Sequence, residues 1–245
     1  MKPIISIIDG IARHPDWRMA EPINMDILPG EQIAICGDNA MGKSRLVEII
    51  TGHYPLLRNE VHYGFDNTGT EAGTPTQKRL ISEQMRFISF RDSYGEQDGT
   101  YYYQQRWNQH DIAEHTPTAG SLQDNIPEFN QGLREKLYSM FALDSVLDKY
   151  IISLSSGELR KFQLTRALLT APRVLILDNP FIGLDAETRK LLKGLLERLT
   201  QETELTVILV LSKYDDVPEF ITHIIPVEGL KVMPKETRKN FMQNV

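Results

Sequence analysis

The sequence predicts an α/β fold built on a parallel sheet, and two observations carry this prediction. In the second half of the chain, short apolar runs that suit buried strands alternate with amphipathic runs of about 10–15 residues. Near residue 40, a glycine-containing loop separates an apolar strand from an apolar-periodic helix. Strands separated by such helices pair in parallel through right-handed crossovers. The 245 residues suit one large domain, or a domain with a subdomain.

Composition narrows the class of protein. Lys and Arg number 27 against 33 Asp and Glu, a net charge of −6, and 41% of residues are hydrophobic, as in ordinary globular proteins. The acidic balance argues against general nucleic-acid binding. One cysteine, Cys36, excludes an intrachain disulfide and a cysteine-based zinc site. With no apolar run of about 18 residues, we expect a cytoplasmic protein, or one held peripherally on the inner face of the membrane.

Apolar runs bounded by turn residues predict the elements of the first half of the chain. These are strands at Ile4–Ile8, Ile23–Leu28, Gln32–Cys36 and Met85–Phe90, a helix at Lys43–Thr51, and a strand followed by a loop within Glu60–Thr76. From Tyr101 to Tyr150 the composition shifts to Gln, Tyr, Asp and Leu, with a helical run at Leu133–Leu143 and a turn at Thr116–Gly120. We interpret this segment as a helical insertion.

The second half returns to regular alternation. The expected elements are a helix at Glu158–Leu169, a strand at Arg173–Leu177, a helix at Ala186–Thr200, and strands at Leu205–Leu211 and Thr222–Pro226. We therefore expect a single domain over 1–245. Its core would comprise 1–96 and 151–233, its helical subdomain about 97–150, and its polar tail 234–245.

The segment GDNAMGKS matches the phosphate-loop pattern G-x-x-x-x-G-K-S and lies between a strand and a helix, as that pattern requires. Glycines let the backbone wrap phosphate oxygens, the helix N-terminus presents unpaired N–H groups, the lysine reaches the β- and γ-phosphates, and the serine ligates Mg²⁺. An ordinary glycine turn before a helix is the alternative. The predicted nucleotide-binding residues here are Gly37, Asp38, Asn39, Ala40, Met41, Gly42, Lys43, Ser44 and Arg45.

A carboxylate ends the apolar strand RVLILD. Buried parallel strands present ligand groups at their carboxyl ends, so Asp178 can hold Mg²⁺ through water beside Ser44. An aspartate after four aliphatic residues is, by itself, more often a plain strand end. Together with the phosphate loop it predicts a metal site formed by Ser44 and Asp178.

Two further motifs resemble those of one family. LSSGELRK, Leu154–Lys161, resembles the signature motif of ATP-binding cassette (ABC) ATPases, usually LSGGQ, and Phe181–Asp185, FIGLD, resembles their D-loop. Ser155 with Glu158 three residues later also forms a capping-box pattern, so an ordinary helix cap is the alternative. LSSGELRK with NPFIGLD is more similar to the molybdenum-associated ModF group, which lacks membrane domains, than to importer cassettes.

The resemblance implies a P-loop NTPase, with a RecA-like lobe, an N-terminal antiparallel β-subdomain and a helical subdomain. It implies ATP and Mg²⁺ as ligands and a head-to-tail dimer, either a homodimer or a heterodimer with another ABC cassette. Each ATP would lie between Gly37–Ser44 of one subunit and four signature residues of the other, with a membrane permease as a further partner. Those four residues are Ser155, Ser156, Gly157 and Glu158.

The chain departs from the family pattern at three positions. The family places a water-polarising glutamate directly after the strand aspartate, where this chain has Asn179, which can orient water but cannot take its proton. The switch histidine is replaced by Lys213, either a contact for the terminal phosphate or a solvated loop residue. The Q-loop glutamine would stand at Phe90 or Arg91. Downstream glutamines that a loop could bring to that place are Gln97, Gln104 and Gln105.

The adenine-stacking aromatic of the family falls near His14, with Trp17 three residues later. Either ring could stack on a base, and Trp17 could equally pack on the N-terminal sheet. The sequence thus favours an ABC-type ATPase that hydrolyses Mg-ATP slowly. Its predicted catalytic residues are Asp178, Asn179 and Lys213. The alternative is an ATP-gated clamp or regulatory binding module that works with a partner without useful turnover.

Overall fold

The computed structural model of the chain describes residues 2–65, 80–90, 117–124, 126 and 132–244, and it divides into two compact units. The first unit draws on 1–87, 173–179 and 196–245, and the second on 88–172 and 180–195. The chain therefore passes between the units several times, and one of these passages falls between Asn179 and Pro180.

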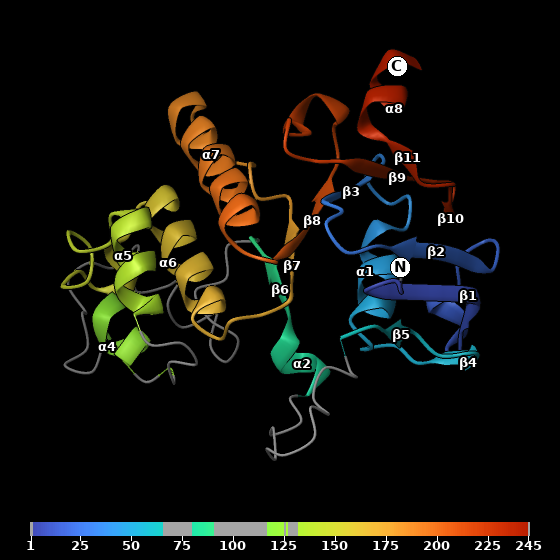
Figure 1. Ribbon diagram of the computed structural model, residues 1–245, viewed down its shortest axis with the longest axis horizontal. Helices are drawn as coiled ribbons and strands as arrows, with labels where there is room; N and C mark the ends of the chain where they lie inside the picture. Colours follow the sequence, from blue (N-terminus) through green and yellow to red (C-terminus); the bar gives the residue numbers. More distant parts are fainter. Residues whose placement is uncertain (1, 66–79, 91–116, 125, 127–131, 245) are drawn as a thin grey trace. The chain divides into compact units, whose positions relative to one another are not determined.

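The first unit begins with an antiparallel sheet in the order β2-β1-β4, with β5 also paired to β1 (Figure 1). Its strands are β1 (Ile5–Ala12), β2 (Ile23–Ile27), β4 (Leu56–Arg58) and β5 (His62–Tyr63). This confirms the expected N-terminal antiparallel sheet. β1 runs beyond the expected end at Ile8 because the register shifts between Ile7 and Gly10, where Asp9 has a φ of 49°.

The second sheet of this unit has the order β10-β9-β3-β8-β7-β6, and β11 pairs with β9. Its strands are β3 (Ile33–Cys36), β6 (Met85–Ser89), β7 (Val174–Asp178), β8 (Thr206–Leu211), β9 (His223–Glu228), β10 (Lys231–Val232) and β11 (Glu236–Thr237). β9, β3, β8 and β7 are parallel neighbours, and β3, β7 and β8 are buried along their whole length. Continuous burial is typical of a parallel sheet covered on both faces, so the predicted fold class is confirmed.

The parallel register brings the carboxyl ends of three strands to one edge. Cys36 of β3 lies opposite Leu211 of β8, and Asp178 of β7 lies opposite Val210 of the same strand. The segments that follow these strands in the sequence therefore begin side by side.

Helices and short 3₁₀ turns complete the first unit. They are α1 (Lys43–Ile50), α2 (Ile81–Gln84), α8 (Arg238–Asn244), η1 (Pro15–Trp17) and η3 (Tyr214–Asp216). α1 lies beside the antiparallel sheet in Figure 1 and contributes four buried aliphatic side chains to the core of the unit. The segment expected as a polar tail contains β11 and α8. β11 pairs with β9, and α8 packs against both of these strands.

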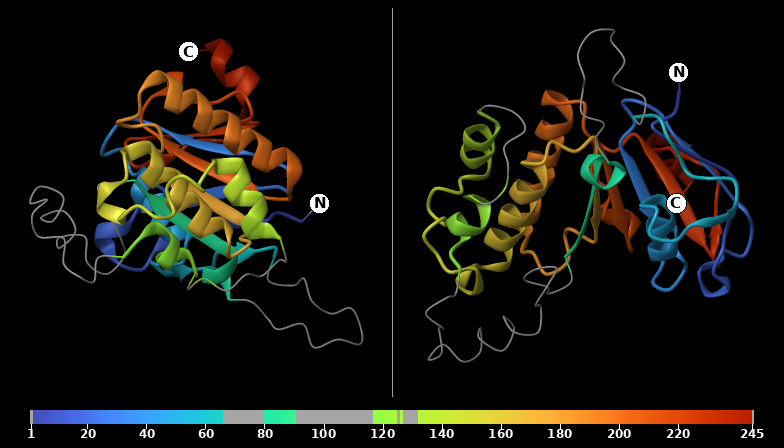
Figure 2. Two further views of the ribbon diagram at one scale, coloured as in Figure 1. Left: turned by 90° about the vertical axis from the view of Figure 1, so that its left-hand side faces the viewer. Right: turned by 90° about the horizontal axis from the view of Figure 1, so that it is seen from below.

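Apart from the last two residues of β6, the regular structure of the second unit is helical in its described parts. It contains α4 (Ala119–Asp124), α5 (Leu133–Phe141), η2 (Ile151–Ser153), α6 (Ser156–Leu168) and the first part of α7 (Ala186–Glu202). α5 and α6 lie side by side (Figure 2). Of the turn expected at Thr116–Gly120, the last two residues belong to α4, because the Thr118 hydroxyl accepts a hydrogen bond from Ser121 N at 3.2 Å, and Thr116 lies outside the described residues. Within the described ranges, no helix has the length and apolarity needed to cross a bilayer.

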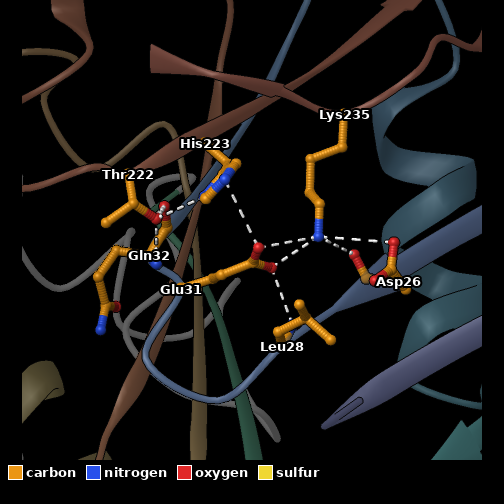
Figure 3. A network of polar contacts seen from close by, with 7 residues as sticks. All are labelled: Asp26, Leu28, Glu31, Gln32, Thr222, His223 and Lys235. Carbon is orange, nitrogen blue, oxygen red and sulfur yellow. Dashed lines mark hydrogen bonds and ion pairs between the residues drawn. The ribbon is translucent and has the colours of Figure 1, made fainter. Parts of the chain in front are cut away.

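A polar network closes the first unit at the edge where β3 and β9 begin (Figure 3). Lys235 Nζ lies 2.7 Å from Glu31 Oε2 and donates to Asp26 O at 3.0 Å. Glu31 Oε2 also accepts from Leu28 N at 2.8 Å, and His223 Nε2 lies 3.6 Å from Glu31 Oε1. Both members of the Glu31–Lys235 pair are largely buried, with side chains 11% and 15% exposed.

We expect Glu31→Gln to lower the free energy of unfolding by about 2 kcal/mol, because it removes the nearer anion of a largely buried ammonium and leaves only the half-exposed carboxylate of Asp26, whose Oδ1 lies 3.5 Å from Lys235 Nζ. The matched control is Glu21→Gln, which removes the exposed partner of Lys231 and should cost less than about 1 kcal/mol. Urea unfolding measures both, with a lower midpoint and an unchanged slope expected for Glu31→Gln. Equal midpoints for the two variants would contradict this prediction.

Candidate functional site

The loop between β3 and α1 follows a path that leaves little room for side chains at its two glycines. A Cβ on Gly37 would lie 2.1 Å from Val227 O, so no other residue fits there without a shift of β9. Gly42 has a φ of 107°, and a Cβ there would lie 3.0 Å from Met19 Cε. Ala40 also takes a left-handed conformation, with a φ of 65°, although it is not glycine. The loop is therefore held in a tightly curved path.

Lys43 lies inside this loop rather than extending into solvent. Its Nζ donates to Gly37 O at 2.6 Å and to Asp38 O at 2.8 Å, and the residue is only 6% exposed. Burial lowers the pKa of Lys43, and the charge of Asp178 acts in the opposite direction. The ammonium is thus positioned within the curve of the loop, with a carboxylate near enough to influence it.

Two residues of the first turn of α1 differ in their surroundings. Ser44 is exposed, whereas Arg45 donates from Nη1 to Arg18 O at 2.9 Å. Asp178, at the end of β7, is 8% exposed, and its Oδ1 accepts from Asn179 Nδ2 at 2.7 Å. Ser44 and Asp178 both belong to the edge where the parallel strands end, and their joint role at a metal ion stays a prediction.

A neutral polar chain crosses this edge. Ser212 Oγ lies 3.2 Å from Asn179 Oδ1 and 3.0 Å from Asn39 Oδ1, so it links the residue after β7 to the phosphate loop. A hydroxyl has one proton and can donate to only one of these oxygens at a time. Asn179 has a φ of 50°, a conformation that asparagine tolerates better than most residues. Sequence reasoning missed Ser212, although its place directly after a strand parallel to β3 is the signal that could have found it.

Lys213, the residue at the switch position, is exposed and lies at the N-terminal end of η3. The next residue, Tyr214, packs on Phe241 of α8 with ring centroids 5.0 Å apart. Burial raises the pKa of Tyr214, and the charge of Glu228 adds to that effect. A contact between Lys213 and a terminal phosphate stays a prediction.

The two aromatic candidates for base stacking have different environments. Trp17 stacks on Tyr54, with centroids 3.8 Å apart and planes 18° from parallel, and both rings pack against the core of the first unit. His14 is exposed, and its Nδ1 accepts a hydrogen bond from Asp16 N at 3.3 Å. Trp17 therefore packs on Tyr54 and the core of the first unit, and base stacking by either ring stays a prediction.

In the second unit, the signature segment opens α6 with the expected capping box. Glu158 N donates to Ser155 Oγ at 3.3 Å, and Ser155 N donates to Glu158 Oε2 at 2.8 Å. Lys149 Nζ lies 2.7 Å from Glu158 Oε1, and this hydrogen bond is the main reason why the pKa of Glu158 is lowered. Both oxygens of the Glu158 carboxylate thus accept hydrogen bonds from residues of the same chain.

The signature segment also packs against the D-loop end of α7. Ser156 is exposed, whereas a Cβ on Gly157 would lie 3.0 Å from Thr188 Cγ2. Asp185 caps the start of α7, accepting from Thr188 N at 2.9 Å and from Thr188 Oγ1 at 2.7 Å. These bonds lower the pKa of Asp185. Gln97, Gln104 and Gln105 lie outside the described residues.

The single cysteine allows a direct test of burial at this site. Cys36 ends β3 with no exposure, and burial raises its pKa to about 12 against the opposing charge of Lys43. We expect the folded protein to react with iodoacetamide at pH 8 at least ~10³-fold more slowly than the unfolded chain, because the thiolate is the nucleophile. Folded and unfolded labelling rates by mass spectrometry would test this. Equal rates would contradict it.

The loop from β3 to α1 has glycines at both ends and a buried lysine, and it lies beside a strand that ends in an aspartate. These features place the chain among the P-loop NTPases. Within that class it belongs to the ABC transporter family, whose model matches residues 20–182.

The chain is 30% identical to the ABC transporter ATP-binding protein ModF of Escherichia coli over 217 residues, which cover 89% of this chain and 41% of ModF. It is 28% identical to the energy-coupling factor transporter ATP-binding protein EcfA2 of Ligilactobacillus salivarius, covering 91% of this chain and 73% of that protein. Among solved structures, cbiO1 of Clostridium perfringens has a TM-score of 0.72 at 19% identity, covering 99% and 92% of the two chains. The expected resemblance to ModF is confirmed, although the chain spans less than half of that protein.

Proposed function

We propose that the chain binds Mg-ATP and hydrolyses it slowly as a head-to-tail dimer, as the energy-supplying cassette of a transporter. The observation that carries this proposal is the ammonium of Lys43, held inside the curve of the phosphate loop by two backbone carbonyls. A preorganised cation in such a loop is complementary to the β- and γ-phosphates.

The residues of the loop fit both ligands. Backbone N–H groups at the start of α1 and the ammonium of Lys43 would hold phosphate oxygens. The exposed hydroxyl of Ser44 and the carboxylate of Asp178 would hold Mg²⁺, directly and through water. When bound, Mg²⁺ neutralises phosphate charge. Arg45, in the same turn of α1, would also contact the nucleotide, and His14 or Trp17 would stack on the base.

Slow turnover follows from the side chains directly after β7 and β8. Asn179 after β7 and Ser212 after β8 can orient a water through an amide oxygen and a hydroxyl, but neither accepts a proton at neutral pH. The loss of a positioned base commonly costs about 10²–10⁴-fold in rate. A chain with this arrangement would therefore stay in its ATP-bound state longer than a cassette with glutamate there.

The partners follow from the signature segment. Exposed Ser155 and Ser156 at the start of α6 would meet the terminal phosphate held by Gly37–Ser44 of the other subunit, either a second copy or another ABC cassette. ModF and EcfA2 are both named transporter ATP-binding proteins, which supports a membrane permease as the further partner and a cytoplasmic, peripherally bound location.

Steady-state phosphate release with Mg-ATP, measured together with sedimentation of the protein with and without nucleotide, tests the proposal. We expect measurable release above a protein-free control and a dimer that needs ATP. A protein that binds no nucleotide at millimolar ATP would exclude the proposed function.

The second candidate function is an ATP-gated clamp that closes on a partner without useful turnover. The amide of Asn179, bonded to both Asp178 and Ser212, favours it because this side chain is engaged by its neighbours and carries no charge. An ATP-dependent dimer with phosphate release no faster than the protein-free control would favour the clamp. Sustained turnover would exclude it.

A further inference from the structure

The second unit contains a buried arginine that joins three motif segments. Arg160 lies on α6, just after the signature segment, and is only 8% exposed. Its Nη1 donates to Pro180 O, directly before the D-loop, and its Nη2 donates to Ile182 O within the D-loop. Its Cζ lies 5.0 Å from the centroid of the Phe90 ring. One guanidinium therefore contacts the D-loop backbone and the ring of Phe90, one of the two residues at which the Q-loop glutamine is expected.

The geometry suits arginine alone. The guanidinium is a planar fork, so two of its nitrogens can donate to two carbonyls two residues apart while its face covers an aromatic ring. A lysine has a single ammonium on a flexible stem and cannot make the three contacts together. The contact is charge-assisted and buried, conditions under which hydrogen bonds are strongest.

Arg160 supplies a bond to the exposed middle of the D-loop, whose other contacts come from Phe181, Leu184 and Asp185; Leu184 is 8% exposed and its N–H donates to Phe181 O at 3.4 Å. Phe181 is buried and Asp185 caps α7, but Ile182 is 61% exposed and Gly183 has a φ of 73°. The exposed middle of the loop is bonded to the signature helix through Arg160 at Ile182 O.

We propose that Arg160, backed by Phe90, is a positioning residue that makes the D-loop and the signature helix move as one surface. The inference rests on the proposed function, because that surface would meet the partner subunit and its nucleotide. When Arg160 is removed, the chain keeps its phosphate loop but loses a preformed dimer surface.

The test compares Arg160→Lys and Arg160→Met with Arg166→Met, which removes an exposed arginine from the same helix. Binding of a fluorescent ATP analogue to the monomer should stay within about 2-fold for all three, since Gly37–Ser44 belongs to the first unit. For both Arg160 variants, ATP-dependent dimerisation should weaken at least ~10-fold, which is about the effect of losing one charge-assisted hydrogen bond. Their kcat should fall and their KM should change little. Arg166→Met should behave as the parent.

A second measurement reports on the D-loop without nucleotide. Ile182→Cys places a reactive thiol on the exposed loop, whereas Cys36 is buried, so a nitroxide label should attach to the loop alone. Its electron paramagnetic resonance spectrum should narrow when Arg160→Lys is added, and also with Phe90→Leu, which keeps the guanidinium and removes the ring. Unchanged spectra would overturn the inference even if Arg160→Met fails to fold.

The two proposals fail in different ways. If the parent neither binds nucleotide nor dimerises, the proposed function fails and the inference fails with it. If the parent dimerises with ATP and both Arg160 variants dimerise equally well with unchanged kcat, the proposed function stands and the role of Arg160 is refuted. A loss of urea stability with normal dimerisation of the folded variant would show a purely structural role, which also refutes it.

Discussion

Lys43→Ala is expected to weaken Mg-ATP binding by about 10–100-fold and to reduce phosphate release to the protein-free level. The change removes the ammonium that lies between Gly37 O and Asp38 O, at distances of 2.6 and 2.8 Å. A charge-assisted hydrogen bond contributes about 1.5–3 kcal/mol, which corresponds to this loss of affinity. Removal of a cation aimed at transferring phosphoryl oxygens typically costs a further factor of about 10²–10³ in rate.

Calorimetric titration with ATP and Mg²⁺ gives the affinity, and the matched control is Lys2→Ala, an exposed lysine of the same unit. Its affinity and turnover should equal those of the parent. Lys43→Met distinguishes charge from packing, because its unbranched side chain fills the buried space without a cation. If Lys43→Met binds Mg-ATP as tightly as the parent, the phosphate loop does not act through this ammonium.

The parts of the fold that the sequence predicted are those whose local signals agree with their final environment. β3, β7 and β8 are near-continuous aliphatic runs because both faces of the sheet are buried, and such runs are recognisable without tertiary information. The capping box of Ser155 and Glu158 is likewise local, since both partners lie within four residues. Most boundaries moved by at most two residues, and the end of β1 moved by four, from Ile8 to Ala12, as expected where strand ends depend on pairing.

The elements that the sequence did not predict are short and depend on distant partners. β4 has three residues, two of them exposed, and is a strand only because it pairs with β1. α8 follows a two-residue strand that pairs with β9. Periodicity over so few residues carries no signal. In the candidate site, the link from Ser212 to Asn39 joins residues 173 positions apart, so it follows from the order of strands in the sheet and from nothing local.

Asn179→Glu is expected to raise the rate of phosphate release by at least ~10²-fold, because a carboxylate at that position can accept the proton of the attacking water. The same change should destabilise the protein without nucleotide. Asn179 has a φ of 50°, which suits asparagine better than glutamate, and its amide donates to Asp178 Oδ1 at 2.7 Å. A glutamate loses that donor and sets a second negative charge beside Asp178, at a cost of about 1–3 kcal/mol.

Asn179→Glu is expected to raise the rate of phosphate release but to lower the stability of the protein. Asn179→Gln is therefore the control that separates these two effects, with phosphate release and thermal unfolding measured for both variants. Glutamine has the length and backbone cost of glutamate but no charge, so it should lose stability without gaining turnover. Faster release for Asn179→Glu alone assigns the slow rate of the parent to its missing base. Equal rates for both variants, with Mg-ATP bound, would instead mean that Ser212 and Asn39 restrict the site whatever follows Asp178, because Ser212 Oγ contacts both asparagines.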